Sequence, residues 1–139
     1  MLDLILLIDD DAPTNMLNSI LINKLNCCKE VVAKQRADLA LEYLRELGES
    51  GVKAPNLILL DINMPGMNGW EFLEEYEKLS EELKAQAIVV MLTTSLNPDD
   101  KRKSKNLSSL NSFENKPLNK AKMRNLLLRY FPELDIPEI

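Results

Sequence analysis

Residues 57–69 read LILLDINMPGMNG, and this stretch carries the strongest indication of the fold. Its first four residues, Leu57 to Leu60, form a continuous apolar run, which is typical of a strand buried on both faces of a parallel sheet. Asp61 follows at the carboxyl end of that run. Functional groups gather at the carboxyl ends of the strands in an open parallel sheet. The stretch therefore predicts a buried strand that presents an acid to a functional site.

Two further apolar runs of the same kind predict two more buried strands, over residues 4–8 and 88–92. Weaker strands are predicted over residues 30–34, around Val31 and Val32, and over residues 112–115. The last of these is polar, and we expect it at an edge of the sheet.

Between and after the strands, apolar residues recur at helical spacing and predict four amphipathic helices. Their apolar residues are Leu17, Ile20, Leu21 and Leu25; Ala40, Leu44 and Leu47; Phe72, Leu73, Tyr76 and Leu79; and Met123, Leu126, Leu127 and Tyr130. Strands and helices alternate, which predicts an α/β fold: an open, doubly wound parallel sheet of five strands with helices on both faces.

One more helix is predicted to begin at Asn97-Pro98-Asp99-Asp100, where a capping residue, a proline in the first turn and two acids coincide. Its body, Lys101 to Asn106, has almost no apolar face, so we expect loose packing. The basic run in this body is interpreted as a solvated helix face, with partner contact as the second interpretation.

Composition narrows the possible functions. The chain has 139 residues, 45% of them hydrophobic, which suits one globular domain with its own core rather than a multidomain enzyme. Histidine is absent, which excludes histidine-dependent nucleophiles, His-ligated metals and phosphohistidine chemistry within this chain. The 22 acidic and 17 basic residues give a net charge of -5, which argues against direct binding of nucleic acid.

The cellular location is also predicted from the sequence. The apolar run of residues 4–8 is short and follows no basic segment, so we expect neither a signal peptide nor a membrane span, and a cytoplasmic protein. Cys27 and Cys28 are adjacent, so they bridge only with strain and are too few to hold a metal alone. We interpret them as reduced residues that pack at a helix end.

Polar residues follow four of the predicted strands. They are Asp9-Asp10-Asp11, Asp61, Thr93-Thr94-Ser95 and Lys116-Pro117. Clustered carboxylates repel one another and are tolerated when a hard cation neutralises them, and oxygen ligands without His or Cys favour Mg²⁺ or Mn²⁺. An Asp held beside such a metal, with a lysine and a hydroxyl near the incoming oxygens, can accept a phosphoryl group. For single acids a simpler reading applies: Asp11 is a good N-cap for the first helix.

The stretch from Leu60 to Gly69 resembles the phosphoacceptor loop of the receiver domain of two-component response regulators. An acidic cluster about 50 residues upstream and a Lys-Pro pair 55 residues downstream of Asp61 extend the resemblance from Leu4 to about Phe131. It implies a flavodoxin-like sheet with strand order 2-1-3-4-5. We expect a receiver domain over residues 1–131 and a short acidic tail over residues 132–139, with no output domain.

The resemblance also assigns the site residues. It makes Asp61 the phosphoacceptor and part of the Mg²⁺ site, for which Mn²⁺ is the substitute. Asp10 would bind the metal directly, Asp9 would support it through water, and Asn63 would offer its backbone carbonyl.

The remaining roles belong to the switch. By the resemblance Thr93 is the switch hydroxyl, Lys116 pairs with the phosphate, and Phe113 changes rotamer when Thr93 is drawn to the phosphate. The Lys116-Pro117 bond is cis in this family. Taken alone, Phe113 and Trp70 are most simply packing residues, with Trp70 a reporter of the site.

The resemblance implies a stand-alone response regulator receiver that takes a phosphoryl group from a phosphohistidine of a sensor histidine kinase or a histidine phosphotransfer protein. It would catalyse only its own phosphorylation and dephosphorylation, and would not be an enzyme in the usual sense. A downstream protein would bind the surface formed by the helix near residues 97–106, the strand over 112–115 and the last helix.

Two departures from the family pattern concern the switch. The family has Gly-Ala a few residues before the switch aromatic, whereas this chain has Ser109-Leu110. Thr94 is larger than the usual Ala or Gly and narrows access to the phosphoryl group. These departures bear on switching geometry and phosphate lifetime rather than on phosphorylation itself.

Two other functions stay open. A metal-dependent phosphohydrolase, similar to the haloacid dehalogenase-like enzymes, would use two acids spaced like Asp9 and Asp11, but it leaves Asp61 unexplained; turnover of a generic phosphate ester discriminates. A receiver fold kept as an unphosphorylated scaffold needs no buried carboxylate cluster. Magnesium binding separates that scaffold from a working receiver.

Overall fold

The sheet of the computed structural model is parallel throughout. The model describes residues 1–51, 54–79, 87–94, 98–105 and 107–136. In this part of the chain the sheet has the order β2-β1-β3-β4-β5. The strands are β1 (Leu2–Ile8), β2 (Cys28–Lys34), β3 (Leu57–Asp61), β4 (Ile88–Thr93) and β5 (Leu110–Asn115). The predicted strand order and the edge position of the polar strand are confirmed.

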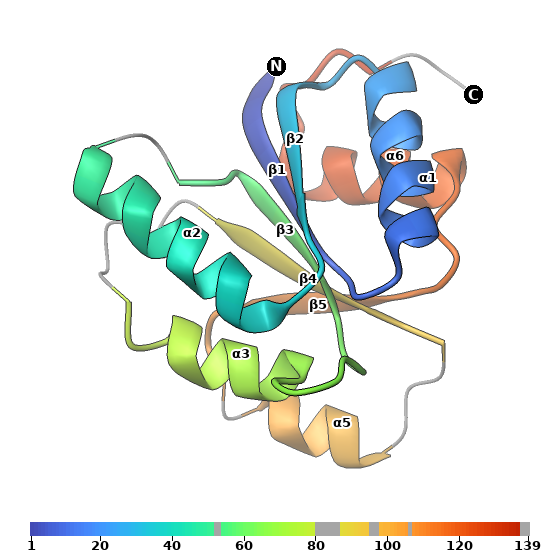
Figure 1. Ribbon diagram of the computed structural model, residues 1–139. Helices are drawn as coiled ribbons and strands as arrows, with labels where there is room; N and C mark the ends of the chain where they lie inside the picture. The colour runs from blue at the N-terminus through green and yellow to red at the C-terminus, as the bar shows by residue number, and fades with distance from the viewer. Residues whose placement is uncertain (52–53, 80–86, 95–97, 106, 137–139) are drawn as a thin grey trace.

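Helices cover both faces of the sheet, as predicted (Figure 1). On one face lie α1 (Ala12–Lys24) and α6 (Lys120–Tyr130), and on the other lie α2 (Ala37–Ser50), α3 (Gly69–Tyr76) and α5 (Pro98–Ser104). The helix α3 ends one turn before Leu79, which the spacing had assigned to it. The predicted cap Asn97, the predicted end Asn106 and Ser95 lie outside the described residues. No helix in the described ranges is long and apolar enough to cross a membrane.

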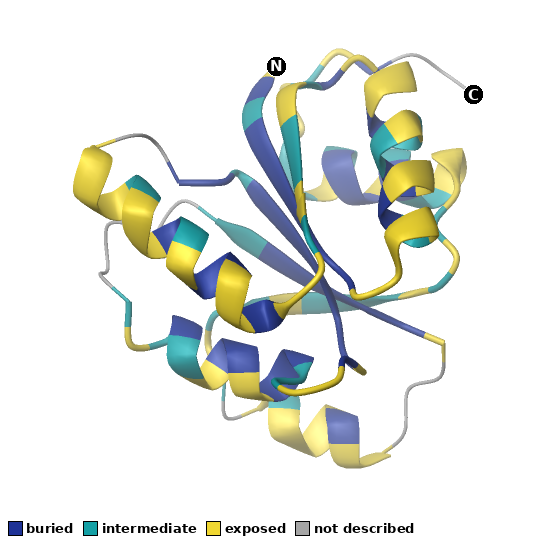
Figure 2. Ribbon diagram, in the orientation of Figure 1, coloured by how far each residue is buried: buried dark blue, intermediate teal, exposed yellow. Residues whose placement is uncertain are grey.

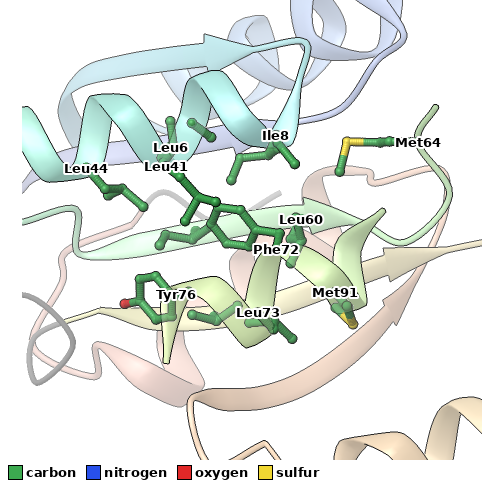
Figure 3. Close-up of a cluster of buried hydrophobic side chains, with 14 of the residues drawn as sticks. Leu6, Ile8, Leu41, Leu44, Leu60, Met64, Phe72, Leu73, Tyr76 and Met91 are labelled. Atoms are coloured by element: carbon green, nitrogen blue, oxygen red, sulfur yellow. The ribbon is translucent and has the colours of Figure 1, made fainter. Parts of the chain in front are cut away.

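The core has two halves, one on each side of the sheet, because side chains alternate along a strand. Leu6 belongs to the half under α2 and α3, and its neighbour Leu7 to the half under α1 and α6. Burial is therefore continuous along the central strands, while the exposed residues gather on the outer sides of the helices (Figure 2). The α2–α3 half is built around Phe72, which stacks on Tyr76 (Figure 3).

The inward face of α1 differs from the prediction. Leu17 and Ile20 are exposed, at 66% and 45%, and the buried residues of this helix are Asn15, Asn18 and Ile22. The predicted apolar stripe is therefore half right, because Leu21 and Leu25 do pack in the α1–α6 half of the core, whereas Leu17 and Ile20 do not. The face is set instead by Asn15, which lies one turn after the helix start and bonds back to the end of β1. Turning that residue inward leaves Leu17 and Ile20 on the outer surface.

Segments at the ends of elements also contribute to the core. Ile136, in the predicted acidic tail, is buried in the α1–α6 half, while residues 137–139 lie outside the described ranges. Cys27 is buried where α1 passes into the sheet, and Cys28 is the first residue of β2; both are free thiols. Burial raises the pKa of Cys27 to about 11, so this thiol is inert at neutral pH.

The turn that leads into β5 is held by Glu77, just beyond α3. Its Oε1 accepts hydrogen bonds from the Ser109 amide at 3.0 Å and from the Ser109 hydroxyl at 2.9 Å. This is the position at which the chain departs from the family's Gly-Ala. Ser109 thus ties the start of β5 to the end of α3.

The orientation of α1 predicts a contrast between two substitutions. Ile22→Ala removes a fully buried side chain and is expected to lower the free energy of unfolding by about 2–5 kcal/mol. Leu17→Ala is expected to change it by less than about 0.5 kcal/mol, because Leu17 is exposed. Urea denaturation of both variants checks this; a larger loss for Leu17→Ala would contradict the packing described for α1.

Candidate functional site

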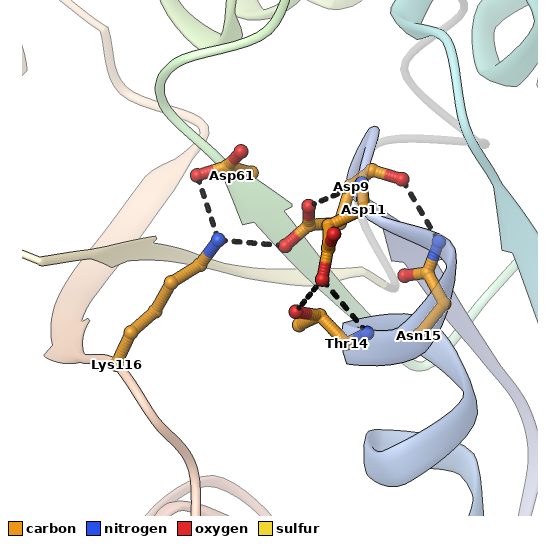
Figure 4. Close-up of polar contacts among 6 residues, drawn as sticks. All are labelled: Asp9, Asp11, Thr14, Asn15, Asp61 and Lys116. Atoms are coloured by element: carbon orange, nitrogen blue, oxygen red, sulfur yellow. Dashed lines mark hydrogen bonds and ion pairs between the residues drawn. The ribbon is translucent and has the colours of Figure 1, made fainter.

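Four strand ends meet at one edge of the sheet. Asp9 directly follows β1, Asp61 ends β3, Thr93 ends β4 and Lys116 directly follows β5. The ends of β4 and β5 are directly bonded, because Lys116 N donates a hydrogen bond to the Thr93 carbonyl at 2.8 Å. Residues that are 107 positions apart in the chain thereby become neighbours (Figure 4).

Lys116 is the cation of this site. Its Nζ lies 2.7 Å from Asp9 Oδ2 and 3.1 Å from Asp61 Oδ1. Both carboxylates are nearly inaccessible, at 3% and 7% exposure. Taking a carboxylate out of water costs several kcal/mol unless an opposite charge compensates. The ammonium group therefore holds two buried acids together.

Asp9 is fixed from three sides. Its second carboxylate oxygen, Oδ1, accepts from the Asp11 amide at 3.0 Å, and its backbone carbonyl accepts from Asn15 Nδ2 at 2.8 Å. Sequence reasoning missed Asn15. The available signal was its position one turn into α1, among apolar neighbours. That position predicts an amide that faces the core only once it is known which face of α1 packs on the sheet.

A divalent cation fits the acidic group. Asp9, Asp10 and Asp61 each place a carboxylate oxygen within 4.8 Å of the others, with Asp10 exposed and the other two buried. Oxygen donors of this kind, without His or Cys, suit Mg²⁺ or Mn²⁺. Asn63 is exposed in the loop that follows Asp61, and its predicted role as a carbonyl ligand stays a prediction.

The charges of the site shift two pKa values. Burial, and next the nearby Asp9 carboxylate, raise the pKa of Asp61 above its usual value, although Lys116 opposes this. Burial alone would lower the pKa of Lys116, but its hydrogen bonds to Asp9 and Asp61 outweigh burial and raise it. Lys116 is therefore fully protonated at neutral pH.

Asp11 does not share in this chemistry. It is the N-cap of α1, as predicted, and its carboxylate accepts from the amide of Thr14 at 3.0 Å and from the Thr14 hydroxyl. These hydrogen bonds lower the pKa of Asp11. The Asp11 carboxylate is thus engaged in capping α1, whereas Lys116 contacts Asp9 and Asp61.

The loop between Asp61 and α3 is held by its ends. Asn68 and Glu71 form a capping box at the start of α3. Gly69, which follows Asn68, donates a hydrogen bond from its amide to the Ile62 carbonyl at 2.8 Å. A Cβ at Gly69 would lie 2.6 Å from the Asp61 carbonyl oxygen, so only glycine allows this approach.

The predicted switch residues lie on the paired strands β4 and β5. Thr93 is buried at the end of β4, and Phe113 is half-buried in β5. The Lys116-Pro117 bond is cis, as the resemblance implied. Thr94 is exposed and lines, with Lys116 and Leu17, an open pocket of about 240 Å³.

Trp70 links this region to α5 in a way that the sequence did not reveal. It is buried, as expected of a packing residue, and its ring lies 6.0 Å from that of Phe113. Its Nε1 donates to Asp100 Oδ1 at 3.1 Å. Asp100, predicted only as an acid of the first turn, is buried, whereas the basic residues of α5 are exposed as predicted.

Comparison with known proteins agrees with this geometry. Residues 5–128 match the model of the response regulator receiver domain. The chain is 34% identical over 115 residues to the probable methanogenesis regulatory protein FilR2 of Methanothrix harundinacea (strain 6Ac), covering 83% of this chain and 72% of that protein.

Solved structures show the same similarity. A two component response regulator from Cytophaga hutchinsonii has 33% identity and a TM-score of 0.84, over 95% of this chain and 98% of its own. The Mn²⁺-bound form of response regulator Rcp1 has 29% identity and a TM-score of 0.73, over 98% of this chain and 99% of its own.

The raised pKa of Asp61 predicts that Asp61→Asn stabilises the metal-free protein at neutral pH. A carboxyl with a higher pKa in the folded than in the unfolded chain disfavours folding once it ionises. This cost is absent below the ordinary value of 3.8, grows as pH rises through the folded pKa, and is complete above it. Lys116 keeps Asp9 as its partner in the variant.

Urea denaturation of both proteins in a chelating buffer, between about pH 4 and pH 7, checks this. The advantage of Asp61→Asn should grow with pH. A variant that is less stable than the parent at pH 7 would show that Lys116 more than compensates the buried charge.

Proposed function

The chain belongs to the response regulator receiver domain family, and from that premise we propose that it accepts a phosphoryl group on Asp61 and thereby switches a protein-binding surface. The observation that carries this proposal is the shared contact of Lys116 with two buried carboxylates, 2.7 Å from Asp9 and 3.1 Å from Asp61. A scaffold gains nothing from keeping two acids buried. A phosphoryl transfer site needs them.

The transfer itself requires little covalent chemistry from the protein. An Asp61 carboxylate oxygen attacks the phosphorus of a phosphohistidine on a partner protein. An O–P bond forms as the P–N bond breaks, and the electron pair of that bond returns to the imidazole nitrogen. The partner must supply the histidine, since this chain has none.

A divalent cation completes the site in this proposal. Asp9, Asp10 and Asp61, with the backbone carbonyl of Asn63, would hold Mg²⁺, and Mn²⁺ would serve as a substitute. The Mn²⁺-bound form of Rcp1, a structural relative, supports this choice. The bound cation supplies charge neutralisation for the phosphoryl oxygens.

Lys116 and Thr93 act on the phosphorylated form. The ammonium of Lys116 already contacts Asp61 and shifts to a phosphoryl oxygen once Asp61 carries one. The hydroxyl of Thr93 moves toward another oxygen. That movement leaves space beside β4 into which the ring of Phe113, half-buried on the adjacent strand, turns.

The proposed partners are proteins on both sides of the transfer. A sensor histidine kinase or a histidine phosphotransfer protein is the donor, and the exposed apolar Leu17, which lines the pocket beside Lys116, supports a protein donor. A downstream protein is proposed to bind across α5, β5 and α6, where Phe113 communicates the change. We propose that the protein acts in the cytoplasm.

The first test of this function is covalent labelling. Incubation with Mg²⁺ and acetyl phosphate is expected to add one phosphoryl group, measured by intact-mass analysis. This label should be labile to hydroxylamine and should not form when a chelator is present. Asp61→Asn should abolish the label. Asp11→Asn is the matched control, because Asn also caps a helix, and it should label like the parent.

Retained labelling of Asp61→Asn would contradict the assignment of the acceptor. Absence of any label, together with no effect of Mg²⁺ on Trp70 fluorescence, would favour the scaffold. Absence of label with an Mg²⁺-dependent fluorescence change indicates an intact site with a short-lived phosphate or a strict need for its kinase.

A second test separates phosphorylation from switching. Thr93→Ala removes the switch hydroxyl but leaves Asp61 and Lys116 in place. It should label to within about threefold of the parent while losing the change in Trp70 fluorescence, because Phe113 no longer moves away from the Trp70 ring. A full fluorescence response in Thr93→Ala would contradict the role of Thr93.

A further inference from the structure

The helix α5 is attached to the domain through a buried polar residue rather than an apolar face. Its seven residues read PDDKRKS, and of those only Asp100 is buried. Most helices of such a fold are held by an apolar face, which α5 lacks. The position of α5 therefore depends on the polar contacts of its buried residue, Asp100.

One of these contacts is the hydrogen bond from Trp70 Nε1 to Asp100 Oδ1, at 3.1 Å and buried from solvent. The other acid of the first turn, Asp99, is exposed and pairs with Arg102 on the same helix. Lys103 adds a contact on the same ring, with its Nζ 5.8 Å from the Trp70 centroid. Two of the residues of α5 thus meet Trp70, one through the indole N–H and one over its face.

Trp70 is itself connected to the acceptor loop and to the switch. It follows Gly69, whose amide bonds to Ile62, the residue after Asp61. Its ring lies 6.0 Å from the ring of Phe113 at an interplanar angle of 59°. One side chain therefore contacts both the switch aromatic and the buried acid of α5.

We infer that Trp70 is a positioning residue whose hydrogen bond to Asp100 holds α5 in place in the unphosphorylated protein and is weakened when Phe113 turns inward. This inference rests on the proposed function for its trigger. The ring of Trp70 loses its neighbour when Phe113 leaves, and the indole N–H then shifts relative to Asp100. The binding surface on α5 is then held less tightly.

The first part of the test needs no phosphate. Hydrogen exchange of the amides of residues 99–104 is compared in the parent, Trp70→Phe, Asp100→Leu and the double variant. Each single variant removes the same bond and should speed exchange of α5 by about tenfold or more. The double variant should add nothing beyond either single change. Asp99→Asn is the matched control and should exchange within about twofold of the parent, because its partner lies on α5 itself.

The second part adds Mg²⁺ and beryllofluoride, a mimic of an aspartyl phosphate. Exchange of α5 should rise in the parent and in Asp99→Asn, while in Trp70→Phe it is already fast and should not rise further. Trp70→Phe keeps a ring beside Phe113, so acetyl phosphate labelling should stay within about threefold of the parent.

Two results would overturn the inference. The first is parent-like exchange of α5 in both Trp70→Phe and Asp100→Leu, and the second is a full beryllofluoride response in Trp70→Phe. The failure of the proposed function is distinguishable, because it would appear as absent labelling of the parent. The comparison of unmodified proteins would still decide whether the bond holds α5.

Discussion

The ion pairs that Lys116 makes with Asp9 and Asp61 are the interaction on which this site depends. Two carboxylates lie almost wholly out of water, and the ammonium group sits between them. The strand order explains how this is possible. Because β1 and β3 are neighbours, Asp9 and Asp61 lie close together, and Lys116, which follows β5, reaches both carboxylates. Without the Lys116 ammonium group, burial and mutual repulsion of the two carboxylates would favour their protonation or unfolding of the protein. Burial of the Asp61 carboxylate therefore lowers the stability of the protein, and in the proposed function this carboxylate is the phosphoryl acceptor.

The rest of the domain divides into a rigid part and a part attached by polar contacts. The central strands and α2, α3 and α6 share two well-buried apolar clusters. In contrast, α5 has Asp100 as its buried residue and meets the body through Trp70. Elements with few apolar contacts open at lower free energy than the core. In the proposed function, this difference would let a change at Asp61 alter the α5 surface and leave the sheet intact.

The sequence predicted the parallel sheet, its edge strand and most helices, because short apolar runs alternate along the chain with longer segments of helical spacing. It also placed Asp9, Asp10, Asp61, Thr93 and Lys116 at one edge. It was only partly right for the packed face of α1, where Asn15 bonds to the Asp9 carbonyl and Leu17 is exposed. It likewise could not find the bond between Trp70 and Asp100, since the two residues are 30 positions apart and either is unremarkable alone. Both misses are tertiary hydrogen bonds of polar side chains, for which no sequence period exists.

In the proposed function Asp61, and no neighbouring acid, carries the phosphoryl group. Borohydride reduces an aspartyl phosphate to homoserine, so reduction after labelling, followed by peptide mapping, marks the modified residue permanently. We expect homoserine at position 61 alone, in the peptide that contains residues 57–69. Homoserine at position 9, 10 or 11 instead would contradict it.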